Sequence, residues 1–130
     1  MTMERPTHAG LRHVALNVHD LDAMKRFYSE LLGFHIEWEP DPDNVYLSSG
    51  IDNLALHRST AASGGALDHL GIVVRTPGEV DRWAAFLESR GIALDAAPRT
   101  HRDGARSLYF RDPDGNSIQI IHHPPISDKT

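Results

Sequence analysis

Residues 11–18 read LRHVALNV, and residues 67–74 read LDHLGIVV. In both stretches large apolar residues alternate with other residues, which is typical of a β-strand with two different faces. His13 and His69 occupy the same place in the two stretches, on the face opposite the larger apolar side chains. This repeat predicts that one structural unit occurs twice in the chain, with the two histidines at equivalent positions.

A helix and three short strands are predicted after each of these first strands, so each unit is βαβββ. Asp20 or Asp22 can cap the first helix, which closes at Gly33. Thr76 and Glu79 form a capping box for the second helix. The apolar stripes of the two helices are Met24, Phe27, Tyr28, Leu31 and Leu32, and Val80, Trp83, Ala84 and Leu87. The strands expected after the helices are 34–39, 45–49 and 53–58, and then 92–96, 106–111 and 116–122.

The length of 130 residues and the hydrophobic content of 40% fit a single domain, 1–130. Its two units are expected at about 9–60 and 65–123. The halves align with an offset of 56 residues at His13/His69 and of 62 at His57/Gln119. We therefore expect an α+β fold.

The apolar face of each set of strands must cover its own helix, which leaves the other face to line a shared concavity. The side chains expected on that face are His13, His57, His69, Tyr109 and Gln119. The prediction is a cupped mixed sheet with helices on its outer face.

The composition of the chain excludes several kinds of site and partner. The chain has no cysteine, so any metal must bind to nitrogen and oxygen. The net charge is −5 and the basic residues are scattered, which argues against a nucleic-acid partner. The N-terminal residues lack an apolar signal core, and no apolar run approaches the roughly 20 residues that span a bilayer. We expect a cytoplasmic protein that does not bind membranes and acts on a small molecule.

The two strand openings, the helix end LLGF (31–34) and the turn RDPDGN (111–116) together resemble the vicinal-oxygen-chelate superfamily. This superfamily contains glyoxalases, fosfomycin- and bleomycin-resistance proteins, and extradiol ring-cleaving dioxygenases. The resemblance covers nearly the whole chain. It implies the glyoxalase/bleomycin resistance/dioxygenase fold, and, because members often dimerise, a homodimer.

The resemblance also implies one divalent metal ion, held by residues on the first and last strands of the units. His13, His69 and Gln119 are the expected ligands. Imidazole suits Fe, Mn, Ni, Co and Zn alike, and Fe(II) is the first choice here. Most members have glutamate where this chain has Gln119, and an amide oxygen is a weaker, uncharged ligand. A site without metal, in which Gln119 only forms hydrogen bonds, is the alternative.

The segment HRDGARSLYFRDPDGNSIQ, 101–119, is closest to the signature of type I extradiol dioxygenases. The chain departs from that signature at Gln119 and at Arg99, which lies two residues before His101. In that branch such residues orient the substrate and move protons, which makes His57, Tyr109 and His101 the expected catalytic residues. His57 is either an acid/base beside the metal or a third ligand. A packed tyrosine and a solvated loop histidine are the plain alternatives for Tyr109 and His101.

Three functions follow from the resemblance. The first is an extradiol-type dioxygenase acting on a catecholic or similar vicinal-oxygen substrate. The second is a glyoxalase- or epimerase-like lyase or isomerase, in which His57 abstracts the proton and the metal acts as a Lewis acid. The third is a binding protein without catalysis, like the bleomycin-resistance relatives.

Overall fold

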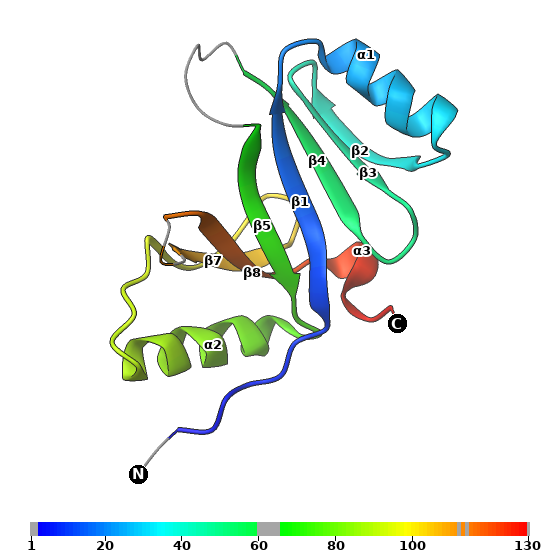
Figure 1. Cartoon of the computed structure of the whole chain (residues 1–130). Helices are drawn as coiled ribbons and strands as arrows, with labels where there is room; N and C mark the ends of the chain where they lie inside the picture. Colours follow the sequence, from blue (N-terminus) through cyan, green and yellow to red (C-terminus); the bar gives the residue numbers. More distant parts are fainter. Residues whose placement is uncertain (1–2, 60–65, 112, 114, 130) are drawn as a thin grey trace. The chain divides into compact units, whose positions relative to one another are not determined.

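The computed structural model describes residues 3–59, 66–111, 113 and 115–129 (Figure 1). Contacts divide the chain into two compact units. The first unit is His13–His69, and the second is Met1–Arg12 together with Leu70–Thr130. Each of the two repeated strands therefore crosses from one unit into the other, and the units are described separately below.

The first unit has the predicted order of elements, a strand, a helix and three strands. They are β1 (Gly10–Val18), α1 (Leu21–Arg26), the π-helical turn η1 (Phe27–Leu31), β2 (His35–Asp41), β3 (Asn44–Ser48) and β4 (Asn53–Arg58). The strands lie in the order β2-β3-β4-β1. β1 and β4 are parallel, and the other pairs are antiparallel.

Asp20 is the N-cap of α1, because its carboxylate accepts a hydrogen bond from the Ala23 N–H at 3.0 Å. Asp22 lies in the first turn instead. The helix widens at its end, where the Leu32 N–H donates to the Phe27 carbonyl five residues earlier. Gly33 follows with φ of 80°, a conformation that suits glycine.

The π-helical turn overturns part of the predicted apolar stripe. Met24 and Tyr28 pack on the core of the first unit, as predicted. Phe27, Leu31 and Leu32 are instead 47%, 70% and 52% exposed. The wider turn rotates these side chains away from the face that a regular helix would bury.

One face of the first unit's strands is covered by α1 and η1, and the apolar residues there form its core. The buried members are Val18, Leu21, Val45, Leu47 and Leu56. Because strand residues alternate, His13, Asn53 and His57 point to the opposite face. The predicted separation of an apolar packing face from a face that carries His13 and His57 is confirmed for this unit.

The second unit contains β5 (Leu67–Val73), α2 (Pro77–Ser89), β6 (Ala96–Thr100), β7 (Arg106–Arg111), β8 (Ser117–His122) and the short α3 (Pro124–Ser127). Its strands lie in the order β5-β8-β7-β6, with β5 and β8 parallel. Thr76 caps α2 by accepting from the Glu79 N–H, whereas the Glu79 side chain pairs with Arg82. Of the predicted capping box, the bond from the Glu79 N–H to the Thr76 side chain is therefore formed, whereas the Glu79 side chain is used by Arg82.

The apolar stripe of α2 packs on β7 and β8 as predicted, and its buried residues include Trp83 and Phe86. The strand expected at 92–96 is wrong, because β6 begins only at Ala96. The Ile92 N–H bonds back to the Leu87 carbonyl, so the chain after Gly91 completes the end of α2 before it extends. α3 was not predicted.

The eight strands, with parallel and antiparallel pairs, and the few helices make this an α+β fold. Figure 1 shows α2 as the longest helix of the chain. Among the described residues, no helix has the length and apolar character needed to cross a membrane.

Candidate functional site

His13 on β1 and His69 on β5 meet inside the first unit. Their Nε2 atoms lie 2.8 Å apart, and each residue is only 6% exposed. The ring centroids are 4.8 Å apart. The two histidines that the repeat singled out are thus direct neighbours.

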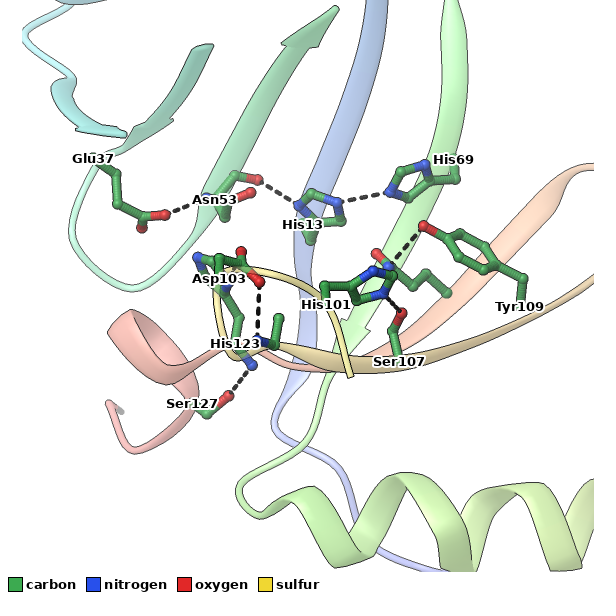
Figure 2. A network of polar contacts seen from close by, with 12 residues as sticks. His13, Glu37, Asn53, His69, His101, Asp103, Ser107, Tyr109, His123 and Ser127 are labelled. Carbon is green, nitrogen blue, oxygen red and sulfur yellow. Dashed lines mark hydrogen bonds and ion pairs between the residues drawn. The ribbon is translucent and has the colours of Figure 1, made fainter. Parts of the chain in front are cut away.

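Hydrogen bonds at the Nδ1 atoms orient both rings. The Nδ1 atom of His13 lies 3.2 Å from the Asn53 carbonyl oxygen, and that of His69 lies 2.7 Å from an Asp68 carboxylate oxygen. The Asn53 side-chain amide in turn donates to Glu37 at 3.0 Å. Figure 2 shows this row from Glu37 through Asn53 and His13 to His69.

Both acceptors on the Nδ1 side are oxygens without a proton, so each imidazole carries its hydrogen on Nδ1. Each Nε2 atom then presents a lone pair toward the other histidine. Two lone pairs 2.8 Å apart repel unless a cation, either a proton or a metal ion, lies between them. Two imidazole nitrogens, each about 2.1 Å from one metal ion, stand about 3 Å apart at an octahedral angle of about 90° and about 3.4 Å apart at a tetrahedral angle. The donor pair therefore fits a divalent metal ion.

Sequence reasoning missed Asp68 and Asn53, which hold the two rings. A carboxylate or carbonyl that accepts from the second ring nitrogen is typical of metal-binding histidines. The signal for Asp68 is its place directly before His69. Asn53 contributes a backbone carbonyl, which no sequence pattern identifies.

His57 on β4 lies further along the same face, half-buried. Its Nδ1 atom lies 2.6 Å from the Asn44 side-chain oxygen, and the Asn44 amide nitrogen donates to Asp41. Burial lowers the pKa of His57, an effect that the nearby Asp68 partly opposes. At neutral pH the ring is therefore uncharged, with its hydrogen on Nδ1 and a lone pair on Nε2 that can accept a proton.

The pairing register corrects the predicted match between His57 and Gln119. Gln119 pairs with Gly71, two residues after His69. The residue two after His13 is Ala15, and its β4 partner is Ala55. Ala55 is thus the structural counterpart of Gln119, and His57 lies two residues beyond that position. The offset of 62 residues was wrong because it aligns two polar side chains that occupy different positions in the strand pairing.

Gln119 and Tyr109 are neighbours in the second unit, paired across β7 and β8. The Gln119 Nε2 atom donates to the Tyr109 hydroxyl at 2.8 Å. Its Oε1 atom is buried and, within the described part of the chain, has no hydrogen-bond partner. A buried amide oxygen without a hydrogen-bond partner costs free energy, and its position suits an atom that can coordinate a cation.

His101 is not a solvated loop residue. Its Nε2 atom lies 2.6 Å from the hydroxyl of Ser107, which is 2% exposed (Figure 2). Arg99 donates to its Nδ1 atom at 3.2 Å. A guanidinium only donates, so the hydrogen of His101 must lie on Nε2 and point to Ser107. Burial first, and then the charge of Arg99, lower the pKa of His101 against the opposing effect of Asp103. Sequence reasoning missed Ser107, although it alternates with Tyr109 on the same strand.

The predicted site residues divide between the two units. His13, His69 and His57 belong to the first unit, and Gln119, Tyr109 and His101 to the second. Among the residues that the structure describes, no three His, Asp or Glu side chains form a metal cluster. The pair of histidines is therefore the strongest metal-binding feature in either unit.

The sequence of this chain also matches a known family. The profile of the Glyoxalase/Bleomycin resistance protein/Dioxygenase superfamily matches residues 10–120. The chain belongs to this superfamily. The resemblance drawn from the repeated strands and the RDPDGN turn is therefore confirmed.

Its relatives include dioxygenases. The chain is 31% identical to biphenyl-2,3-diol 1,2-dioxygenase of Sphingomonas paucimobilis over 121 residues, which cover 89% of this chain and 40% of the relative. A variant of homoprotocatechuate 2,3-dioxygenase from Brevibacterium fuscum matches with a TM-score of 0.73 and 25% identity, over 96% of this chain and 36% of the other. This superfamily member thus spans well under two thirds of these dioxygenases.

An epimerase shares the same fold. Methylmalonyl-CoA epimerase from Streptomyces coelicolor matches with a TM-score of 0.67 and 20% identity, over 92% of this chain and 98% of the other. At this identity the match describes the fold of the superfamily alone.

Proposed function

We propose that this chain is a divalent-metal-dependent dioxygenase of the extradiol type, acting on a catecholic or similar vicinal-diol substrate. The observation that carries the proposal is the close approach of the buried Nε2 atoms of His13 and His69, 2.8 Å apart. The dioxygenase relatives and the segment 101–119 support the choice of reaction.

His13 and His69 would hold the metal ion, with Gln119 as the third protein ligand. Gln119 belongs to the other unit, so its part is argued from its place in the sequence motif and from its buried, unbonded Oε1 atom among the described residues. Fe(II) is the first choice, and Mn, Ni, Co or Zn suit the same donors. When bound, the ion would supply coordination sites for the two vicinal oxygens of the substrate and redox chemistry toward O2.

His57 is the proposed acid/base. A catechol must lose protons to chelate a metal ion, and the Nε2 lone pair of a neutral His57 can accept one. Asn44 keeps that lone pair available by holding the hydrogen on Nδ1. Tyr109 would orient the substrate through its hydroxyl. The Nε2 hydrogen of His101 is committed to Ser107, so we assign His101 a positioning role near Tyr109.

Oxygen uptake tests this function. Protein loaded with Fe(II) without air, and then given O2 and a catechol, should consume one O2 per ring opened, because both oxygen atoms enter the product as the ring bond beside a hydroxyl breaks. The His57→Gln variant should retain its iron and lose most of the rate, by about 10²-fold or more. Protein that holds iron and consumes no O2 with any catechol contradicts the proposal.

A second candidate, an epimerase- or glyoxalase-like reaction, is favoured by two features of the site. The third expected ligand is an uncharged amide, which leaves more positive charge on an ion for Lewis-acid chemistry. His57 is a neutral base. This candidate predicts exchange of the α-proton of an α-hydroxycarbonyl compound with deuterium, which His57→Gln abolishes. Exchange without oxygen uptake would favour it over the dioxygenase.

The homodimer expected from the superfamily is part of the same proposal. Light scattering of the purified chain at micromolar concentration measures its mass directly. A mass of one chain would contradict this expectation.

A further inference from the structure

Three large apolar side chains lie exposed on the helical segment of the first unit, in which η1 continues α1 (Figure 1). Phe27, Leu31 and Leu32 are 47%, 70% and 52% exposed. Phe27 and Leu31 are four residues apart, so they lie on the same side of the segment. We call Phe27, Leu31 and Leu32 the apolar patch. Neighbouring exposed apolar side chains of this size are typical of a surface that binds a partner.

The π-helical turn gives the apolar patch its position. Such turns are rare and are often found at functional sites. Here the turn directs outward three side chains that a regular helix would direct toward the core. The Phe27 ring contacts Tyr28 edge-on, with centroids 5.3 Å apart, and Tyr28 packs on the core of the unit. The patch is therefore supported from below by the core.

Two opposite charges border the apolar patch. Arg26 and Glu30 are both exposed and are also four residues apart. This spacing allows an ion pair within one helix. Within the described part of the chain, however, neither side chain forms an ion pair or a hydrogen bond. Both charges are therefore available to another molecule.

The order of these residues is complementary to itself. In a contact with two-fold symmetry, residue i meets residue j of the partner, and j meets i. Two copies of the segment can lie antiparallel, with the axis near residues 28 and 29. Each Arg26 then lies opposite Glu30 of the partner subunit, and each Phe27 lies opposite Leu31 of the partner subunit. Both the charges and the apolar side chains are matched twice.

The charge of the first unit also favours this surface for contact with a second copy. The unit contains nine Asp and Glu residues against three Lys and Arg. Residues 23–34 contain two of the cations, Lys25 and Arg26, and only one acid, Glu30. The rest of the unit has eight acids and Arg58. Two copies of so acidic a unit repel one another least where their helical segments meet.

We propose that the apolar patch, with Arg26 and Glu30 at its border, binds the same surface of a second copy of this chain. The apolar side chains form the centre of the contact, and two ion pairs between Arg26 and Glu30 form its rim. The proposal rests on the homodimer expected with the function proposed above, and it names the surface that forms this dimer. It does not depend on the metal ion or on the reaction.

Sedimentation equilibrium of the full chain tests the apolar centre. Leu31→Glu places a charge where the two copies exclude water, so it should raise the dissociation constant of the dimer by about tenfold or more. The matched control is Leu11→Glu, because Leu11 is also exposed, at 61%, and lies outside the first unit. This control should stay within about twofold of the wild type. Circular dichroism verifies that both variants are folded.

Charge reversal tests the antiparallel arrangement. Arg26→Glu and Glu30→Arg each place like charges opposite one another, so each variant alone should dissociate about threefold more readily or worse. An equal mixture of the two variants should form a heterodimer at least as tight as the wild-type dimer. One variant then carries two negative charges on the segment and the other carries two positive charges. An effect confined to one helix would not restore association in the mixture.

The outcomes separate this proposal from the others. A dimer that Leu31→Glu leaves intact, or a mixture of the charge variants that stays dissociated, overturns the surface and leaves the homodimer standing. A mass of one chain at every concentration overturns both. Oxygen uptake by the iron-loaded protein tests the reaction independently. A dimer that Leu31→Glu dissociates, in protein that consumes no O2 with any catechol, supports the surface and contradicts the dioxygenase.

Discussion

Among single residues, Gln119 is the expected ligand that is not a histidine, and its surroundings are consistent with a role as ligand. Its amide nitrogen is used by Tyr109, which leaves the oxygen as the atom available to an ion. A glutamate in this place would turn the Tyr109 hydroxyl from an acceptor into a donor. It would also add a charge that favours a divalent cation.

The Gln119→Glu variant should therefore bind a divalent metal more tightly than the wild type. We expect the dissociation constant for Co(II) to fall about tenfold or more, which corresponds to about 1.4 kcal/mol. The measurement is calorimetric titration of the metal-free protein, with Gln119→Met as the variant that keeps the length but removes the oxygen. Equal affinities of the wild type and both variants would show that residue 119 does not reach the metal.

The two histidines could be found from the sequence because a duplicated strand places the same residue type twice. What could not be found is the contact that orients each ring, since the Asn53 carbonyl and the Asp68 carboxylate depend on strand pairing. His57 illustrates the same limit. Its residue type is right for an acid/base, but the register shows Ala55, not His57, opposite the position that matches Gln119.

Secondary-structure elements were predictable where one periodicity extends through the whole segment. The alternating residues of β1 and β5 and the stripe of α2 are of this kind. η1 was missed because a π-helical turn leaves no signal in the spacing of apolar residues, so Phe27 and Leu31 were expected on the wrong face. β6 was placed too early because the end of α2 uses the residues after Gly91.

The capping of α1 gives a test at this scale. Asp20→Ala removes the acceptor of the Ala23 N–H and should lower the free energy of unfolding by about 1 kcal/mol. Asp22→Ala is the matched control, since among the described residues Asp22 has no side-chain hydrogen bond and lies in the first turn, where it interacts favourably with the helix dipole. Its loss should cost less than about half as much. Urea unfolding measures both. A larger loss of stability in Asp22→Ala than in Asp20→Ala would show that Asp22, not Asp20, caps the helix.

For the whole molecule, charge is distributed unevenly between the two units. The first unit has nine acidic residues against three basic ones, and the remaining residues have nine against ten. The overall charge of −5 therefore arises in the unit that carries His13, His57 and His69. This distribution attracts metal cations to that unit and disfavours anionic molecules there.

Stability should decrease in mild acid. Burial lowers the pKa of His57, His101 and His122 from the ordinary value of 6.5, so the unfolded chain binds protons more readily than the folded chain. These histidines therefore make their whole contribution to the free energy of unfolding above pH 6.5. That contribution is lost as the pH falls from there toward the lowered pKa values. Urea unfolding at a series of pH values measures this fall, which His122→Gln should reduce. A stability that rises on acidification through this range would contradict the assignment.

The central claim is that His13 and His69 bind a metal ion through their facing Nε2 atoms. Equilibrium dialysis against Co(II), followed by metal analysis, tests it most directly. We expect one ion per chain in the wild type and in His19→Gln, which changes an exposed histidine, and none in His13→Ala or His69→Ala at the same free Co(II). Variants that still unfold cooperatively yet retain one ion per chain, or a wild type that binds none, would contradict the claim.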